Sequence, residues 1–279
     1  MTGIPVYNVN NNCSTGSTGP YMGRNMIAHG AADCVLVIGF EKMFPGSLQS
    51  FFQNRANPTG TTNLMMKETR GVTKAPGPRS YLAMQAVYGS TLEDFAEIGR
   101  VNHAHSKNNP YSQFPDEYTP MIHEPLTKLQ CCPTSDASAA AVLVSQSFLD
   151  ARPHLKSQAI LIAGQATATD TPDLFRRSAI DLIGYGISEL AATQALKEAS
   201  VNPKDVKVYE LHDCFSANEM VTIEALGLAD KGKAHELIRA GGITYGGQVV
   251  INPFGGLISK DRKATMRNQC ILPICAVTI

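Results

Sequence analysis

Strand-like and helix-like segments alternate in two separate parts of this chain, and this alternation limits the folds that it can adopt. In the N-terminal part, an apolar segment at 4–9 precedes a helix-like segment at 14–29 and a second apolar segment at 34–38. A second run begins with apolar residues 159–163 and continues through 187–227. Strand–helix–strand units form parallel sheets, because the helix crosses over the sheet. The pattern therefore predicts an α/β fold of two related halves that share one layered core.

The second run gives the clearer pattern. Residues 187–200 are predicted to form a helix, because small and apolar side chains recur along one side and Asn202-Pro203 marks its end. A strand over 206–211 and a helix over 217–227 follow. The strand 206–211 ends where polar residues begin, at the edge of the sheet where reactive groups collect in α/β folds.

Residues 41–128 differ in character from both runs. Pro and Gly are frequent there and strand patterns are absent, although 81–88 and 92–105 have helix-like spacing. A long, loop-rich insertion of this kind commonly covers a binding site. After it, 137–144 is predicted to be a strand and 147–151 a short helix.

Composition excludes several classes of protein. Lys and Arg total 24, as do Asp and Glu, so no basic surplus indicates nucleic acid as a partner. No apolar run reaches the roughly 18 residues that a membrane span needs. The seven cysteines include no CxxC pair, and the adjacent Cys131 and Cys132 could close only a strained bridge. We therefore expect free thiols in a reducing compartment.

Cys13 lies where the first apolar segment meets the first predicted helix. The start of a helix presents free backbone N–H groups and a partial positive charge, which stabilise a thiolate and favour its role as a nucleophile. The alternative is an inert thiol buried in the core. A turn into a helix is a recurring place for nucleophiles, so the local context favours the first interpretation.

His212-Asp213-Cys214-Phe215 follows the strand 206–211 and forms the second candidate site. A His and a Cys can exchange protons near neutral pH, because both titrate within a few units of it. The alternative is a structural loop in which Asp213 or Ser216 caps the next helix and His212 is a packing residue. A metal site is disfavoured, because neighbours on an extended strand point in opposite directions.

Other patterns give weaker signals. His103 and His105 suggest metal ligands, but on a helix they point to different faces, so solvated or capping histidines are favoured. The Gly-rich turns at 245–247 and 252–256 permit close backbone approach to a substrate and serve equally as tight strand ends. The turn at 108–112 either contacts a polar ligand or satisfies its own backbone.

Five ordered motifs together resemble the thiolase domain of the sterol carrier protein x family. They are Asn-Asn-Asn-Cys-Ser-Thr-Gly-Ser (10–17), Asn-Asn-Pro-Tyr-Ser-Gln-Phe (108–114), Leu-Gln-Cys-Cys-Pro-Thr-Ser-Asp (129–136), Glu-Leu-His-Asp-Cys-Phe-Ser (210–216) and Gly-Gly-Leu-Ile-Ser-Lys (255–260). The resemblance implies a layered α/β/α/β/α fold with two related halves and an inserted loop domain, incomplete in both halves. It also implies an acyltransferase of lipid metabolism that cleaves 3-ketoacyl-CoA with CoA.

The resemblance assigns roles to three residues. Cys13 resembles the nucleophile that takes the acyl group as a thioester, and His212 resembles a donor of the oxyanion hole. Cys214 resembles the acid/base that handles the proton on the reacting carbon. Acyl-CoA and CoA are the implied substrates, with no cofactor and no metal.

The resemblance also implies domain boundaries and assembly. The N-terminal half would comprise 1–40 and 129–150, the insertion 41–128, the C-terminal half 151–260, and a divergent tail 261–279. Family members are dimeric and peroxisomal, so we expect a homodimer in the peroxisome. The chain ends without a peroxisomal tripeptide, which makes a cytoplasmic location the alternative.

The sequence departs from the family after Lys260. In the family this motif continues into Gly-His-Pro, whose His activates the nucleophile, whereas here Asp261-Arg262-Lys263 follows and 261–279 contains no His. Met1 falls directly before the nucleophile segment, so we expect a chain truncated at both ends relative to the family. The expectation is very low thiolysis; the alternative is a non-catalytic thiolase-like fragment or pairing partner of a full-length subunit.

Overall fold

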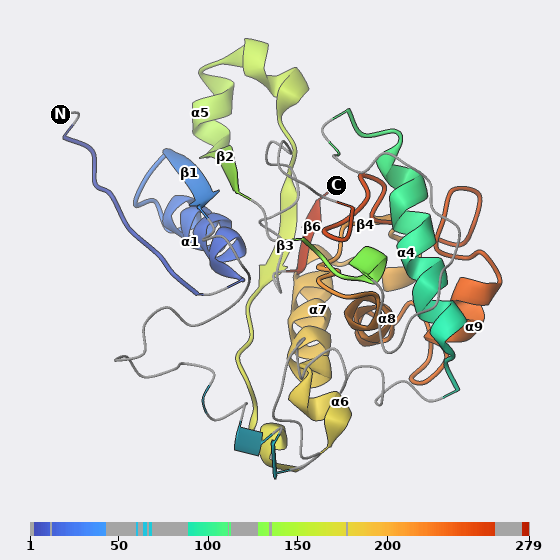
Figure 1. Ribbon diagram of the computed structural model, residues 1–279. Helices are drawn as coiled ribbons and strands as arrows, with labels where there is room; N and C mark the ends of the chain where they lie inside the picture. The colour runs from blue at the N-terminus through green and yellow to red at the C-terminus, as the bar shows by residue number, and fades with distance from the viewer. Residues whose placement is uncertain are drawn as a thin grey trace.

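The computed structural model describes most of both predicted halves and part of the region between them. The described residues are 3–11, 13–42, 60, 64–65, 67–68, 89–110, 112, 128–133, 136–176, 178–259 and 275–278. Figure 1 shows a unit of α1, β1, β2 and α5 beside a larger body that contains α4, α7, α8 and α9. The predicted helix at 81–88 and the tail segment 260–274 lie outside the described residues.

The N-terminal unit is one helix packed on a two-stranded sheet. α1 (Thr15–Ala28) covers one face of β1 (Cys34–Glu41) and β2 (Ala137–Val144). The helix lies close to the sheet, because a Cβ at Gly23 would come within 2.8 Å of the Leu143 side chain. α5 (Gln146–Asp150) follows β2, with the Ser145 hydroxyl accepting from the Phe148 amide.

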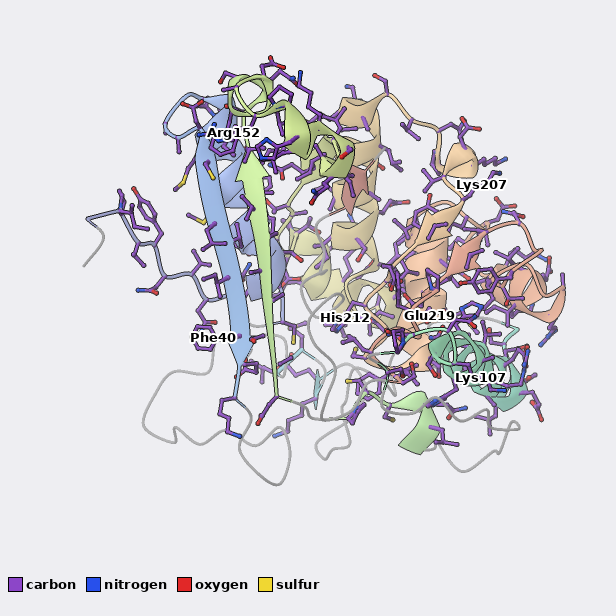
Figure 2. All side chains as sticks on the ribbon, turned by 90° about the horizontal axis from the view of Figure 1, so that it is seen from above. Phe40, Lys107, Arg152, Lys207, His212 and Glu219 are labelled. Atoms are coloured by element: carbon purple, nitrogen blue, oxygen red, sulfur yellow. The ribbon has the colours of Figure 1, made fainter. Side chains whose placement is uncertain are left out.

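The pairing of the strands corrects the expected parallel units. β1 and β2 run antiparallel, with Cys34 opposite Val144 and Glu41 opposite Ala137. The predicted strand at 4–9 is not a strand: Ile4, Val6 and Tyr7 are 66–76% exposed, and no ladder includes them. Figure 2 shows this segment lying apart from β1. Apolar residues can be extended without pairing, because a strand also needs a neighbour with free backbone groups.

The second half packs a long helix on a small sheet. β3 (Ile162–Ala166) pairs antiparallel with β6 (Cys275–Thr278), and α7 (Tyr185–Ala199) crosses β3. A Cβ at Gly164 would lie 2.2 Å from the Ala195 carbonyl oxygen, so only Gly allows this approach. α7 confirms the predicted helix at 187–200, but β3 begins three residues later than the expected strand at 159–163.

The main hydrophobic core lies between α4 (Leu92–Ser106), α7, α8 (Ser216–Ala225) and α9 (Ala234–Arg239). β4 (Val208–Tyr209) and β5 (Val250–Ile251) form a short parallel pair against these helices. The largest fully buried apolar side chains of this core are Ile98, Met220, Ile223, Ile238, Ile243 and Ile251. Each contributes about 1.5–3 kcal/mol by leaving water.

Shorter elements complete the described structure. α6 (Ala179–Leu182) precedes α7, and 3-10 turns span Lys128–Gln130, Pro153–Gln158, Pro172–Arg176 and Pro203–Asp205. α4 lies in the predicted insertion yet packs against α8 and α9 of the C-terminal half. The boundaries 1–40, 41–128, 129–150, 151–260 and 261–279 stay predictions.

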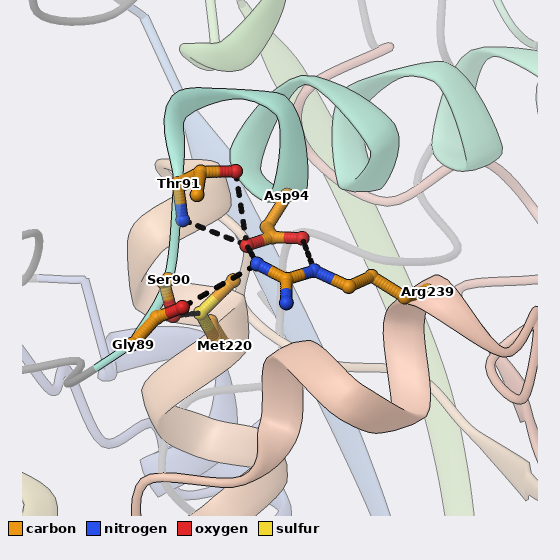
Figure 3. Close-up of polar contacts among 6 residues, drawn as sticks. All are labelled: Gly89, Ser90, Thr91, Asp94, Met220 and Arg239. Atoms are coloured by element: carbon orange, nitrogen blue, oxygen red, sulfur yellow. Dashed lines mark hydrogen bonds and ion pairs between the residues drawn. The ribbon is translucent and has the colours of Figure 1, made fainter.

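Two polar anchors hold these parts together. α1 meets β3 and α7 where Arg24 pairs with Glu198 (2.7 Å) and the Gln165 side chain donates to the Tyr21 carbonyl (3.1 Å). α4 meets α9 where the buried Asp94 carboxylate accepts from Arg239 Nε and Nη2, each at 2.7 Å. Figure 3 shows this second contact, with the Thr91 amide also donating to Asp94 (2.7 Å) at the start of α4.

The Asp94–Arg239 pair gives a stability prediction. Burial raises the pKa of Asp94, but hydrogen bonds from Arg239 and Thr91 outweigh it, so its pKa lies below the ordinary value. Arg239→Ala should lower the free energy of unfolding by about 1–3 kcal/mol at pH 7, because a buried charge loses its donor. Because the pKa of Asp94 is lower in the folded state than its unfolded value of about 3.9, the ion pair stabilises the fold at pH values above about 3.9. The stability difference between wild type and Arg239→Ala should therefore shrink as the pH falls through the folded-state pKa of Asp94.

Urea denaturation at pH 7 and at acidic pH measures this difference. Arg176→Ala is the matched control, because the Arg176–Asp173 pair is exposed and should change stability by less than about 1 kcal/mol. Equal losses in the two variants would contradict the assigned role of Arg239.

Candidate functional site

Cys13 lies immediately before the first residues of α1, as predicted, although a loop rather than a strand leads into it. The turn is fixed by the Ser14 amide and hydroxyl, which both donate to the Asn11 carbonyl at 3.0 and 2.8 Å. The Asn11 amide in turn donates to the Thr15 hydroxyl at 2.8 Å. The Cys13 side chain is exposed, so this thiol is accessible to reagents and is not a core residue.

His212 and Cys214 follow β4, on a loop that leads into α8. An isolated antiparallel bridge joins Cys131 to Phe215, and the Cys132 amide donates to the Cys214 carbonyl at 2.9 Å. This register places Cys132 opposite Cys214, where side chains of an antiparallel pair lie on the same face. Cys132 is thus a neighbour of the site that sequence reasoning missed, although the Leu-Gln-Cys-Cys motif contains it.

The thiols of Cys13, Cys132 and Cys214 share one electrostatic environment. Burial raises the pKa of Cys214 well above its ordinary value, with further increases from Cys132, Asp213 and Cys13. Burial, Asp213, Cys131 and Cys13 raise the pKa of Cys132 to about 12. Charge–charge effects of this kind act over short distances. The structure therefore places the exposed Cys13 of the N-terminal unit within electrostatic range of the half-buried Cys214 of the C-terminal half.

Asp213 is fully buried and anchors the loop from within. Its carboxylate accepts from the Leu257 and Ile258 amides and, at 3.0 Å, from the Asn102 side chain of α4. Gly256 (φ 61°) allows this approach, because a Cβ there would come within 2.2 Å of Asp213 Oδ2. The Gly-rich turn at 252–256 therefore supports the His212–Cys214 loop.

The alternative in which Asp213 caps α8 is wrong. Phe215 is the N-cap residue of α8, and no side chain caps it. The loop is instead fixed from the next turn of the helix, where the Asn218 side chain donates to the His212 carbonyl at 2.7 Å. In the view of Figure 2, His212 lies between the β1–β2 sheet and α4.

The two histidines of α4 are buried, contrary to the expectation of solvated or capping side chains. His105 Nδ1 lies 3.0 Å from the Ile251 carbonyl and its Nε2 lies 2.8 Å from the Thr244 hydroxyl. Burial lowers the pKa of His105, so this imidazole is a neutral packing residue. The error arose because α4 is covered on both faces, which its sequence pattern does not show.

Among the described residues, no group of three or more His, Cys, Asp or Glu side chains could hold a metal ion. No helix in the described part of the chain has the length and apolar character needed to cross a membrane.

Asn109, in the turn at 108–112, donates to the Phe254 carbonyl at 3.0 Å and so links this turn to the 252–256 turn.

Comparisons with known proteins agree on one family. Residues 166–267 match the family described as "Thiolase C-terminal domain-like". Sterol carrier protein 2 of Bos taurus is 46% identical over 97% of this chain and 52% of its own length. Non-specific lipid-transfer protein-like 2 of Caenorhabditis elegans is 43% identical over 93% and 67%. Benzoylsuccinyl-CoA thiolase subunit BbsB of Thauera aromatica is 31% identical over 96% and 72%.

Solved structures support the fold. The Ltp2–ChsH2 aldolase matches with a TM-score of 0.69 and 23% identity over 89% of this chain and 65% of that chain. The dimeric peroxisomal thiolase of Saccharomyces cerevisiae matches with a TM-score of 0.50 and 18% identity over 92% and 66%. At these identities the likeness shows a thiolase-like fold and no more.

The chain spans about half the length of the sterol carrier protein 2 relatives that it matches. Its similarity to them nevertheless covers nearly all of its own residues, including the segments that carry Cys13, His212 and Cys214. The likeness to the thiolase subunit of Thauera aromatica extends over most of both chains. The chain therefore belongs to the thiolase family, in the group represented by sterol carrier protein 2.

Proposed function

We propose that this chain carries a thiolase site at which Cys13 accepts an acyl group from a 3-ketoacyl-CoA. One observation supports this above the others: an exposed thiol before a helix lies within electrostatic range of a half-buried thiol on the His212–Cys214 loop. Claisen chemistry needs both a nucleophile and a second group that transfers a proton. CoA acts as the second substrate, and no cofactor takes part.

The proposed reaction proceeds in two steps. The Cys13 thiolate attacks the C3 carbonyl, and cleavage of the C2–C3 bond leaves the acyl group on Cys13 as a thioester. The electron pair of that bond goes to C2, which takes a proton from the Cys214 thiol, giving acetyl-CoA. The CoA thiol then attacks the thioester, returns a proton to Cys214 and releases a shortened acyl-CoA. The raised pKa of Cys214 keeps its proton in place at neutral pH, as the first step requires.

His212 is proposed to donate a hydrogen bond to the oxyanion that forms at the reacting carbonyl. It is half-buried on the same loop as Cys214, and its carbonyl is held by Asn218. Donors fixed before the reaction stabilise developing charge more effectively than water does. Together, Cys13, His212 and Cys214 would supply the nucleophile, the oxyanion donor and the proton.

Turnover by this chain is proposed to be slow. Among the described residues, no imidazole forms a hydrogen bond with the Cys13 thiol, and the sequence after Lys260 lacks the family's Gly-His-Pro. Loss of the base from a nucleophile–base pair costs several orders of magnitude in rate. Acylation of Cys13 should therefore be easier to detect than multiple turnovers.

A non-catalytic role as a pairing partner of another thiolase subunit is the second candidate. The β1–β2 face opposite α1 exposes a row of apolar side chains, namely Leu36, Ile38, Phe40 and Val142, each 57–81% accessible. Contiguous apolar surface of this kind commonly marks an interface between chains. We propose that this face pairs two copies of the chain or one copy with a longer subunit. A peroxisomal location, which the family resemblance implies, is part of the same proposal.

The first prediction is an acyl adduct on Cys13. Incubation with an acyl-CoA should add the acyl mass to the peptide that contains Cys13, measured by mass spectrometry after digestion. Cys13→Ser should abolish the adduct. Cys34→Ser should leave it intact, because Cys34 is also an exposed thiol but lies on β1. Equal labelling of Cys34, or no adduct over hours, would refute the proposed nucleophile.

The second prediction separates the two thiols. Cys214→Ala should slow acylation of Cys13 by a simple acyl-CoA only modestly, because the departing CoA thiolate can take its proton from water, whereas the carbanion formed at C2 needs a positioned acid. It should slow cleavage of a 3-ketoacyl-CoA by about 10²–10⁴-fold, the usual contribution of a general acid. Single-turnover formation of acetyl-CoA measures this step. Equal loss of both reactions would show that Cys214 does not serve as the acid.

The third prediction concerns assembly. The wild-type chain should sediment as a dimer, and Phe40→Asp should shift it toward the monomer, because a charge would enter the apolar contact. Phe175→Asp is the control, since Phe175 is 58% exposed but lies away from the β1–β2 face. Analytical ultracentrifugation distinguishes the outcomes, and an unchanged sedimentation coefficient for Phe40→Asp would rule out this face.

A further inference from the structure

A buried carboxyl group behind the candidate site has no role in the proposed reaction. Glu219, in the first turn of α8, is fully buried, and its Oε2 accepts from the side-chain amides of Asn102 (2.7 Å) and Asn252 (3.0 Å). A buried carboxyl group so near a reactive loop must be either a paired charge or a neutral acid.

The hydrogen bonds of Asn102 fix the orientation of this network. Its Nδ2 donates to Glu219 Oε2 at 2.7 Å and to Asp213 Oδ2 at 3.0 Å, which uses both hydrogens of the amide. If the side-chain amide of Asn102 were turned round, its oxygen would face the carboxyl groups of Glu219 and Asp213. One side chain of α4 therefore joins the carboxyl group of α8 to the carboxylate between His212 and Cys214.

The network leaves two buried acceptors without a donor. Glu219 Oε1 and Asn102 Oδ1 both lack a hydrogen-bond partner among the described residues. In the described part of the chain no ion pair includes Glu219, whereas two carboxyl groups, Asp213 and Glu210, act on it electrostatically. A proton on Glu219 Oε1 would turn an unsatisfied acceptor into a donor and remove a buried charge. Burial first, and then the charges of Asp213 and Glu210, raise the pKa of Glu219 well above its ordinary value, which agrees with this assignment.

Asp213 then carries the buried negative charge of this network, and it is well supplied with donors. The Leu257 and Ile258 amides and the Asn102 side chain all donate to it. Because Asp213 lies between His212 and Cys214, its position sets the position of both neighbours.

We propose that Glu219 is a positioning residue that acts as a neutral carboxylic acid: it holds Asn102 against Asp213 and so fixes the His212–Cys214 loop. The roles of His212 and Cys214 rest on the function proposed above, whereas the neutral state of Glu219 does not. Glu219 touches no reacting atom, so it would act only through Asn102 and Asp213.

The test compares a neutral mimic with a truncation. Glu219→Gln keeps the size and neutrality of the acid and should preserve the protection of Cys214 from iodoacetamide within about twofold. Glu219→Ala removes the acceptor for Asn102, so alkylation of Cys214 should accelerate about 10- to 100-fold, the equivalent of leaving one buried amide hydrogen without its acceptor. Alkylation of Cys13 should not change in either variant. Glu224→Gln is the control, because Glu224 is a buried carboxyl group of the same helix that binds the Ala234 amide.

Infrared difference spectroscopy supplies a readout that requires neither activity nor the Ala variant. The wild-type protein should show the C=O stretch of a protonated carboxylic acid at neutral pH, and Glu219→Gln should lose that band while Glu224→Gln retains it. A band that persists in Glu219→Gln, or a Gln variant as exposed at Cys214 as the Ala variant, would overturn the proposal. Failure of the acyl adduct on wild-type Cys13 would instead reject the proposed function and leave these spectra unchanged.

Discussion

The buried carboxylate of Asp213 is the constraint on which the site depends. An unpaired charge in a protein interior costs several kcal/mol, so the carboxylate must be matched by donors before the loop can take its observed course. Those donors come from α4 and from the turn after Gly256, two segments far apart in the sequence. The loop with His212 and Cys214 is therefore ordered only when the helical core and the Gly-rich turn are both assembled.

Opposite environments give the two thiols of the site opposite properties. Cys13 is exposed just before α1, where reagents can reach it. Cys214 is half-buried, and burial together with Cys132, Asp213 and Cys13 raises its pKa, which keeps its proton bound. Two groups of one chemical type in such different surroundings can take different roles in one reaction.

The sequence predicted the helices well because their signals are local. α4, α7 and α8 agree with the expected segments within two residues at each end, and β2 agrees at both ends. The strand at 4–9 was wrong, and parallel pairing holds only for β4 and β5 among the described strands, because a strand depends on a partner that the local pattern does not contain. Cys132 was missed for the same reason, since only the register with Cys214 brings it to the site.

The distance between the two thiols is set by an anchor remote from both. Cys13 is held by α1, whereas Cys214 is held by the core around α8, so the docking of α1 fixes their separation. That docking rests on Gln165 of β3, which donates to the Tyr21 carbonyl, and on Glu198 of α7, which accepts from Arg24 and from the Gln165 amide. Glu198 and Gln165 thus connect α1 to α7 through β3. Small shifts at this contact would move Cys13 relative to Cys214, and reactions between well-oriented groups lose rate steeply with misplacement of about 1 Å.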